Sequence, residues 1–333
     1  MDVKVFIVKA TLFILISTSL VLSESVHSPT DLLARFKSFI TDYNRNYTTK
    51  EEHEFRFQTF KKNFRRIAST NANGATYGVN KFADWTDEEF KELLGNRQVP
   101  TQEIVNSELH HSLSTAKFPS SLDWREHKRN IVGPVRNQGR CGCCWAFSTV
   151  ETIASAWALA GNSFTELSVQ QLLSCDNMDG GCRGGSFYLA CNWLTKNRVP
   201  LETESANPYL GKRDKCVKHA TNTGIILKKF TTSNFIYQES SSMIAALNQN
   251  GPLSIAVDAT SWRDYVGGII QHHCDGKVLN HAVQVVGYKL DAPVPYWIVR
   301  NSWGEDFGDH GYIYIKMGKN VCGIAESVGW VNF

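Results

Sequence analysis

The sequence is short of net charge and of long apolar runs. Its 333 residues carry 35 lysines and arginines against 32 aspartates and glutamates, a formal net charge of +3. So small an excess gives no reason to expect binding to nucleic acid or to an anionic membrane surface. Hydrophobic residues make up 42% and charged residues 20% of the chain. That composition excludes a wholly disordered or collagen-like protein and, at this length, predicts about two folded domains.

One apolar run stands out near the N-terminus. Residues 10–22 are largely apolar, follow the basic residues Lys4 and Lys9, and lead into Ser23. The run is shorter than the ~20 residues that a membrane span needs, and its layout is typical of a secretory signal peptide. We therefore expect residues 1–23 to be a removed signal rather than a buried core helix. No second long apolar run follows, so the mature protein is expected to be soluble, with no membrane segment.

Cysteine is missing from the first 140 residues, and all nine cysteines follow. A secretory route leads into an oxidising compartment, where cysteines can pair. Nine is an odd number, so disulfides cannot use every thiol. At least one thiol therefore needs another explanation.

The cysteine-free part, over residues 24–96, has helical patterns. One stripe mixes acidic, basic, amide and apolar side chains at steps of three or four residues, which places them on one side of a single helix. Its members are Glu52, Arg56, Phe60, Asn63, Ile67 and Asn71. A helix that only covers a core would carry an apolar stripe instead. Residues 78–84 then indicate an extended turn, and residues 97–116 a polar linker.

The chain changes character from about residue 117, where tryptophan, glycine and short apolar segments become frequent. Helices are predicted at residues 145–160 and 169–174. Strands are predicted at residues 252–259, 281–288, 296–301 and 311–317. Helices that precede strands in this way indicate an α+β domain.

Three separate segments of the sequence contain candidate catalytic residues. Cys144 lies in the segment from Gln138 to Phe147 and opens a predicted helix, where the partial positive charge of the helix N-terminus stabilises a thiolate. The other patches centre on His281 and on Asn301. A cysteine and a histidine form a thiolate–imidazolium nucleophile, and an amide side chain can orient the imidazole.

Taken singly, each of these residues has an ordinary interpretation, such as a disulfide, a core histidine or a turn. In this chain the histidine follows the cysteine by 137 residues and the asparagine by 157. Their joint occurrence in this order is close to the papain-type signature, which has both about 130–150 residues after the cysteine. The chain resembles a papain-family cysteine protease precursor over nearly its whole length. The mixed stripe resembles the propeptide helix of the cathepsin L-like branch. A second propeptide motif is matched by Gly78, Asn80, Phe82 and Asp84.

The resemblance implies an α+β, papain-like two-lobe fold. A helical lobe and an antiparallel, β-barrel-like lobe would enclose an active-site cleft. Residues 24–116 would form an inhibitory propeptide and residues 117–333 the mature peptidase. The implied activity is that of a thiol-dependent endopeptidase made as a zymogen, acting on proteins or peptides as a monomer without a cofactor. We expect lysosomal protein breakdown, with the extracellular space as the alternative location. The propeptide would inhibit its own enzyme, with residues 97–116 running through the cleft until acid releases them.

The resemblance also implies a role for each residue of the catalytic patches. Cys144 would attack the peptide carbonyl, and His281 would hold the proton and deliver it to the leaving amine. Asn301 would orient His281, with Trp303 shielding their contact from water. Gln138 would donate its side-chain N–H to the oxyanion, together with the backbone N–H of Cys144.

Substrate binding follows from the same resemblance. Gly184 and Gly185 would form the extended edge that hydrogen-bonds the substrate backbone, because glycine permits close approach. The pocket for the side chain two residues before the scissile bond would be lined by Phe187, Ala256, Leu279, Ala282 and Ser327. This pocket is apolar, so hydrophobic side chains are predicted there. Glu326 adjoins Ser327, and an alignment shift of one residue would weaken that prediction.

Cysteine pairing is likewise implied by the resemblance rather than by spacing. The implied disulfides are Cys141–Cys182, Cys175–Cys216 and Cys274–Cys322. Cys143 stands where the family usually has a small residue. It could be inert, which we favour, carry a redox function, or form a vicinal disulfide with Cys144. Cys191 is predicted to be a buried small hydrophobe, in preference to a Cys143–Cys191 bridge.

Other functions fit the sequence less well. A zinc site at His272, His273 and Cys274 is not expected, because the spacing fits no common zinc motif. Asn46 heads the only glycosylation sequon. The chain could also be a catalytically inactive homologue that binds or regulates, or its N-terminal part could act as a free protease inhibitor. The intact set of catalytic residues favours the active enzyme.

Overall fold

The computed structural model describes residues 29–70, 74–98, 117–217, 224–272, 274 and 276–333. The chain divides into two compact units, one ending at Phe57 and the other running from Gln58 to Phe333. The predicted signal, residues 1–23, lies outside the described residues. Most of the predicted linker at residues 97–116 does too.

The first unit is built on aromatic packing. It contains α1 (Pro29–Asp42) and the beginning of α2 (Lys50–Thr70). The Phe36 ring packs against Tyr47, His53 and Phe57, with ring centroids 5.9, 5.4 and 5.2 Å apart. The exposed Asn46 lies in the connection between the two helices.

Helix α2 confirms the prediction that the mixed stripe belongs to one helix. Glu52 accepts a hydrogen bond from the backbone N–H of Thr48 at 3.0 Å, so it secures the start of the helix. Asn63 is buried and donates from Nδ2 to the carbonyls of Ala83 and Trp85, both at 2.8 Å. Glu52 and Asn63 therefore satisfy backbone groups, which an apolar side chain could not do. Asn71 lies outside the described residues.

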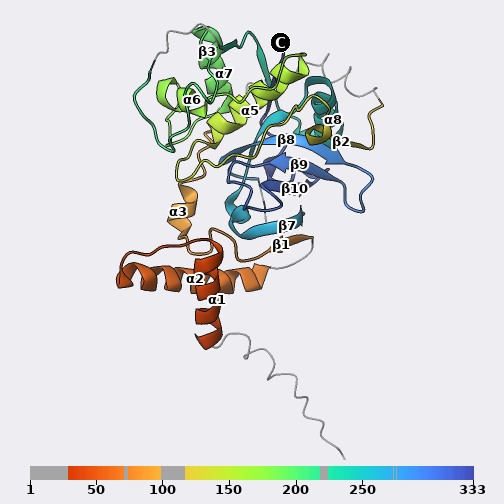
Figure 1. Ribbon diagram of the computed structural model, residues 1–333. Helices are drawn as coiled ribbons and strands as arrows, with labels where there is room; N and C mark the ends of the chain where they lie inside the picture. The colour runs from red at the N-terminus through yellow and green to blue at the C-terminus, as the bar shows by residue number, and fades with distance from the viewer. Residues whose placement is uncertain (1–28, 71–73, 99–116, 218–223, 273, 275) are drawn as a thin grey trace, which may run out of the picture. The chain divides into compact units, whose positions relative to one another are not determined.

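The helical lobe of the second unit is centred on α5 (Cys144–Leu159), which is buried along nearly its whole length. Helices α6 (Val169–Cys175) and α7 (Phe187–Lys196) both contact α5 (Figure 1). Strands β3 (Pro200–Leu201) and β4 (Ile225–Ile226) form a small two-stranded antiparallel sheet in the same part of the chain. Two disulfides, Cys141–Cys182 and Cys175–Cys216, join its loops.

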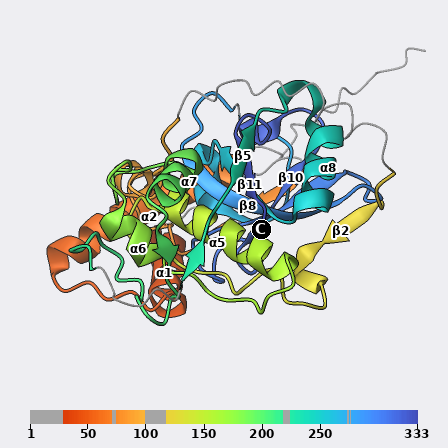
Figure 2. The same cartoon turned by 90° about the horizontal axis from the view of Figure 1, so that it is seen from above.

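The other lobe is a nine-stranded sheet in the order β1-β7-β10-β9-β8-β6-β11-β5, with β2 paired to β8. The strands are β1 (Ala75–Tyr77), β2 (Ser121–Asp123), β5 (Phe230–Ser233), β6 (Leu253–Val257), β7 (Tyr265–Ile270), β8 (His281–Lys289), β9 (Tyr296–Arg300), β10 (Tyr312–Lys316) and β11 (Val328–Val331). Helix α8 (Glu239–Asn250) packs on β6 and β8 (Figure 2). The third disulfide, Cys274–Cys322, lies in this lobe.

The sheet differs from the expected antiparallel lobe in one pairing and in its membership. Strand β7 pairs with β10 in parallel, so the sheet is mixed rather than antiparallel throughout. Strand β1 comes from the N-terminal part of the chain and pairs with β7. Glycine-rich β7 and the short strands β5 and β11 were not among the apolar segments predicted as strands. The predicted helices and the four predicted strands are present, with ends shifted by a few residues.

A row of polar contacts joins α5 to the sheet. Ser148 donates from Oγ to the Val283 carbonyl at 2.7 Å and lies 2.7 Å from Ser254 Oγ. One and two helical turns further along, Glu151 pairs with Arg300 at 3.2 Å and Ser155 accepts from Gln284 at 3.2 Å. These side chains are buried, so a polar group that lost its partner would be left without a hydrogen bond and would destabilise the fold.

Replacing Glu151 with alanine should leave the Arg300 guanidinium buried without its carboxylate partner. We expect the free energy of unfolding in urea to fall by about 3–5 kcal/mol. The double variant Glu151→Leu/Arg300→Met should recover most of that loss, because no charge remains buried. A cost for Glu151→Ala no larger than that of the exposed control Glu305→Ala would contradict this assignment.

Candidate active site

Cys144 begins α5 and is fully buried. Backbone groups of Ala282, Gly95, Trp145 and Cys144 itself act to lower the pKa of its thiol. Burial nevertheless dominates and raises the pKa of the Cys144 thiol to about 11. The start of the helix does act in the expected direction, because the backbone groups of Cys144 and Trp145 lower the pKa of the thiol. In this covered state the loss of water outweighs them.

His281 opens β8 directly beside Ala282, whose backbone contacts the thiol. Its Nε2 lies 2.8 Å from Asn301 Oδ1. The backbone N–H of Ser302 donates to the same oxygen at 2.8 Å, which identifies that atom as the acceptor. Nε2 therefore carries a proton, and Nδ1 is left as a buried nitrogen that has no partner among the described residues.

Tryptophan rings enclose the imidazole. Trp303 is buried, and its ring centroid lies 4.7 Å from that of His281 at an interplanar angle of 31°. Trp262 meets the imidazole edge-on at 6.0 Å. This burial lowers the pKa of His281 to about 4, although the hydrogen bond to Asn301 acts in the opposite direction.

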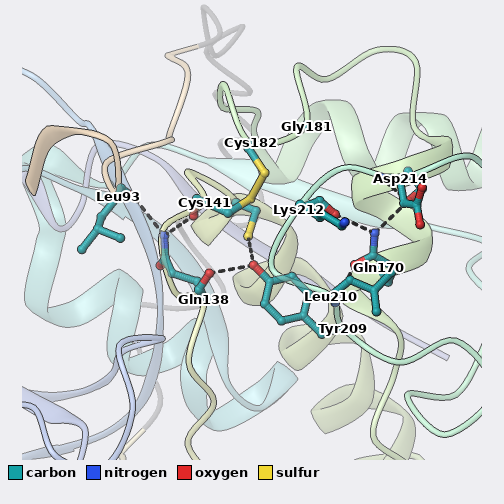
Figure 3. Close-up of a disulfide and its surroundings, with 12 residues drawn as sticks. Leu93, Gln138, Cys141, Gln170, Gly181, Cys182, Tyr209, Leu210, Lys212 and Asp214 are labelled. Atoms are coloured by element: carbon teal, nitrogen blue, oxygen red, sulfur yellow. Dashed lines mark hydrogen bonds between the residues drawn. A yellow bond between two sulfur atoms is a disulfide. The ribbon is translucent and has the colours of Figure 1, made fainter. Parts of the chain in front are cut away.

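Gln138 precedes α5 in the chain and is also buried. Its Nε2 donates to the carbonyl of Leu93 at 2.9 Å and to that of Cys141 at 2.8 Å (Figure 3). Its Oε1 accepts a hydrogen bond from Ser302 Oγ at 2.7 Å. The side chain therefore has a fixed orientation, with its N–H directed at a carbonyl from another part of the chain.

The segment Leu93–Arg97 occupies the site with its backbone. Gly185 donates to the Gly95 carbonyl at 2.9 Å and accepts from the Arg97 N–H at 2.7 Å, forming a short parallel pairing. Asn96 donates to the carbonyl of Asn280 at 2.9 Å. The segment that meets the site therefore begins earlier than the expected residues 97–116. It was missed because its polar flanks have no periodic pattern.

Glycine is required where this segment meets the loop before α5. A Cβ on Gly95 would lie 1.8 Å from the Gly142 carbonyl oxygen, and one on Gly184 would lie 2.7 Å from the Gly95 oxygen. Both closest atoms belong to the backbone and cannot turn aside. Backbone therefore packs on backbone across the site.

The predicted side-chain pocket is a cavity of about 890 Å³ next to this segment. All five expected residues line it: Phe187, Ala256, Leu279, Ala282 and Ser327. The expectation of a wholly apolar pocket is wrong, because Thr232, Asn234 and Glu326 line it as well. Glu326 accepts a hydrogen bond from Asn320 Nδ2 at 3.0 Å.

The cysteines pair as the resemblance implies, in three disulfides. Cys143, Cys144 and Cys191 are free and buried, so neither the vicinal disulfide nor the Cys143–Cys191 bridge is formed. Within the described ranges, no group of histidine, cysteine and acidic residues could hold a metal ion. In that same part of the chain, no helix is long and apolar enough to cross a membrane.

Comparison with known proteins decides the family. The family model described as "Papain family cysteine protease" matches residues 118–331. The model described as "Cathepsin propeptide inhibitor domain (I29)" matches residues 36–90. The chain belongs to the papain family of cysteine proteases. It is a papain-like zymogen that carries its own inhibitory propeptide. Cathepsin O of Homo sapiens is 43% identical over 255 residues, which are 76% of this chain and 78% of that protein. The cysteine proteinase of Trypanosoma brucei brucei is 38% identical over 317 residues, 91% of this chain and 68% of that protein.

Solved structures of papain-family precursors have the same fold. The digestive procathepsin L2 proteinase of Tenebrio molitor larval midgut superimposes with a TM-score of 0.81 at 29% identity, covering 91% of this chain and all of that one. The recombinant stem bromelain precursor gives 0.78 at 30% identity, covering 91% and 99%. The segments 167–171, 261–274 and 316–325, outside the catalytic patches, predict a particular likeness to cathepsin O, and the comparison confirms it.

The two shifted pKa values predict an unreactive thiol in the intact precursor. The pKa of Cys144 is raised to about 11 and that of His281 is lowered to about 4, so both groups are neutral between those pH values. Alkylation of Cys144 by iodoacetamide should therefore accelerate only as the pH approaches about 11. Peptide mapping of the intact precursor, with Cys144→Ser as the background, measures this rate. A pH-independent plateau of fast alkylation between pH 5 and 8 would show a preformed ion pair and contradict the prediction.

Proposed function

We propose that Cys144, His281, Asn301 and Gln138 perform peptide hydrolysis once the propeptide has left. The observation that carries this proposal is the fixed imidazole. Asn301 Oδ1 accepts from His281 Nε2, and Ser302 confirms the identity of that oxygen. The other imidazole nitrogen, His281 Nδ1, has no partner among the described residues. The next residue in the chain, Ala282, acts through its backbone on the Cys144 thiol. An imidazole held this way can take the thiol proton.

The proposed reaction is acyl transfer in two stages. The Cys144 proton moves to His281 Nδ1, and the sulfur attacks the carbonyl carbon of the scissile bond. The resulting oxyanion receives hydrogen bonds from Gln138 Nε2 and from the Cys144 backbone N–H. The C–N bond then breaks, His281 gives its proton to the leaving amine, and a thioester remains. A water molecule then loses a proton to His281 and attacks the thioester carbonyl. The C–S bond breaks, the carboxylic acid product leaves, and His281 returns the proton to the Cys144 sulfur.

Asn301 and Trp303 support the imidazole in this scheme. The Asn301 carbonyl stabilises the Nε2–H tautomer and also the imidazolium that forms. The ring of Trp303, 4.7 Å from the imidazole, keeps water away from that contact. Loss of an oxyanion donor such as Gln138 would lower turnover by about 10²–10³-fold.

Substrate would use the groups that the segment Leu93–Arg97 now occupies. The Gly185 N–H and carbonyl are bonded to Gly95 and Arg97, so a substrate strand can form the same pairing after the segment departs. The adjoining pocket has Phe187, Leu279 and Ala282 on its walls and favours an apolar side chain. Its polar lining, with Glu326, supports a preference that is broader than a purely apolar pocket would give.

The remaining features belong to the precursor's route through the cell. We propose residues 1–23 as signal, 24–116 as propeptide and 117–333 as mature monomeric enzyme. The exposed Asn46 would carry a glycan on the propeptide. Lysosomal protein breakdown is the proposed role, reached through the secretory pathway.

Inhibition in the precursor rests on backbone contacts and on ion pairs. The Leu93 carbonyl accepts the hydrogen bond from the Gln138 side-chain N–H that the oxyanion would need. Outside the site, Arg66 pairs with Asp264 at 2.7 Å and Asp87 with Arg263 at 2.7 Å. Burial raises the pKa of the Asp264 carboxyl, so acid removes its charge and weakens its pair with Arg66, which supports acid as the trigger of release.

Acid activation followed by a thiol-directed epoxide tests the catalytic assignment. Peptide mapping should find the label on Cys144, because the backbone of Ala282, the residue next to His281, acts on this thiol. A Cys144→Ala precursor should remain unprocessed under the same conditions, since it lacks the nucleophile. Label confined to Cys143, or a Cys144→Ala chain that processes itself, would contradict the proposal. An unlabelled chain that never hydrolyses peptides would favour the alternative, an inactive homologue.

Adding one methyl group to Gly95 tests the inhibitory contact separately. The new Cβ would meet the Gly142 carbonyl at 1.8 Å, so Gly95→Ala must push the segment away from the site. We expect the epoxide to label the unprocessed precursor about tenfold or more faster at pH 7, which corresponds to about 1.4 kcal/mol of lost contact. Gly78→Ala is the matched control, because its Cβ would meet only a Val266 methyl at 3.3 Å. Equal labelling of both variants and wild type would show that Gly95 does not hold the block.

A further inference from the structure

Cys143 is the departure from the family pattern that the catalytic scheme leaves unused. It is fully buried immediately before α5 and forms no disulfide. Its sulfur lies 3.0 Å from the hydroxyl of Tyr209. That hydroxyl donates to the Gln138 carbonyl at 2.7 Å (Figure 3). A chain of two hydrogen bonds thus links the unusual cysteine to Gln138.

The direction of this chain follows from the groups themselves. A carbonyl oxygen can only accept, so the single hydroxyl proton of Tyr209 is used at Gln138. The Cys143 thiol must then donate its proton to the Tyr209 oxygen. Burial raises the pKa of both the Cys143 thiol and the Tyr209 hydroxyl, which keeps both protons in place. The thiol therefore acts as a hydrogen-bond donor and not as a nucleophile.

Tyr209 is itself held firmly. Its backbone N–H donates to Glu204 at 2.8 Å, and Glu204 pairs with Arg136 at 2.5 Å. Its ring meets the Phe147 ring edge-on at 5.0 Å. The hydroxyl is therefore a fixed point in the helical lobe, against which the Gln138 carbonyl is positioned.

The peptide after Gln138 needs such a fixed point. Gly139 has a φ of +57°, and a Cβ there would meet nothing within 4 Å. Glycine removes the steric barrier that would otherwise keep this peptide group in one orientation. On the carbonyl side the orientation is held by Tyr209, and on the N–H side by Asn137 Oδ1 at 3.0 Å.

We propose that Tyr209, with its hydroxyl proton directed by Cys143, is a positioning residue that holds Gln138 in the orientation needed to stabilise the oxyanion. The inference rests on the proposed role of Gln138. Tyr209 contacts Cys143 and Gln138 but none of the reacting atoms, so its effect on the oxyanion passes through Gln138. Because the oxyanion exists only in the transition state, the loss should appear in kcat rather than in KM.

The test uses acid-activated enzyme and hydrolysis of a peptide substrate. Tyr209→Phe should lower kcat about three- to tenfold with KM nearly unchanged, as expected for the loss of one hydrogen bond. Cys143→Ala should lower kcat by a smaller factor, and Cys143→Ser, which keeps a donor, should restore it. In a Gln138→Ala background, Tyr209→Phe should cause no further loss of kcat.

Tyr288 offers a matched control. Its hydroxyl accepts from Asn248 Nδ2 at 3.1 Å and donates to the Pro119 carbonyl at 2.9 Å, the same arrangement away from the site. Tyr288→Phe should leave kcat unchanged while lowering thermal stability by a similar amount.

Three outcomes would overturn the inference. These are equal kcat losses in Tyr209→Phe and Tyr288→Phe, no recovery in Cys143→Ser, or an additive loss in the Gln138→Ala background. Full kcat in Gln138→Ala alone would instead refute the proposed oxyanion role, and the inference would fall with it. Thermal unfolding of each variant separates these effects from simple misfolding.

Discussion

The site depends on the contact between α5 and the sheet. The thiol comes from the helix and the imidazole from β8, so neither residue can be correctly placed unless the two elements have one register. Hydrophobic packing alone tolerates sliding, whereas Ser148, Glu151 and Ser155 each require a particular partner on the sheet lobe. The polar row therefore fixes the register, and with it the approach of Cys144 to the backbone of Ala282.

The same burial that orders the site also makes it inert in the precursor. Water is excluded by Trp303, by the lobes and by the segment Leu93–Arg97, so neither Cys144 nor His281 favours its charged form. The inhibitor presents backbone and glycine where a substrate would present its own backbone. Removing the segment would return water to the thiol and free the Gln138 N–H. Inhibition and activation are thus two states of one set of hydrogen-bonding groups.

Much of this arrangement could be predicted from the sequence, because the strongest constraints are local or carried by motifs. The stripe from Glu52 to Ile67 indicated one helix, and Cys144, His281 and Asn301 had a recognisable order. Contacts between distant backbone groups leave no such trace. The residues around Gly95 form no pattern that predicts its close contact with Gly142. The pairing of β7 with β10 joins strands that are far apart in the chain. Glu326 lines the pocket together with its neighbour Ser327, although only Ser327 was expected there. The partner of Cys143 came from a loop with no catalytic motif.

Amide hydrogen exchange of the precursor tests most directly whether backbone pairing closes the site. The amides of Asn96, Arg97 and Gly185 donate to carbonyls across the site. They should exchange slowly at pH 7 in the intact precursor, and Gly185 should become fast after acid processing removes its partner. Exchange of Arg97 and Gly185 at the rate of an unstructured peptide, in a precursor that is still inactive at pH 7, would contradict the account.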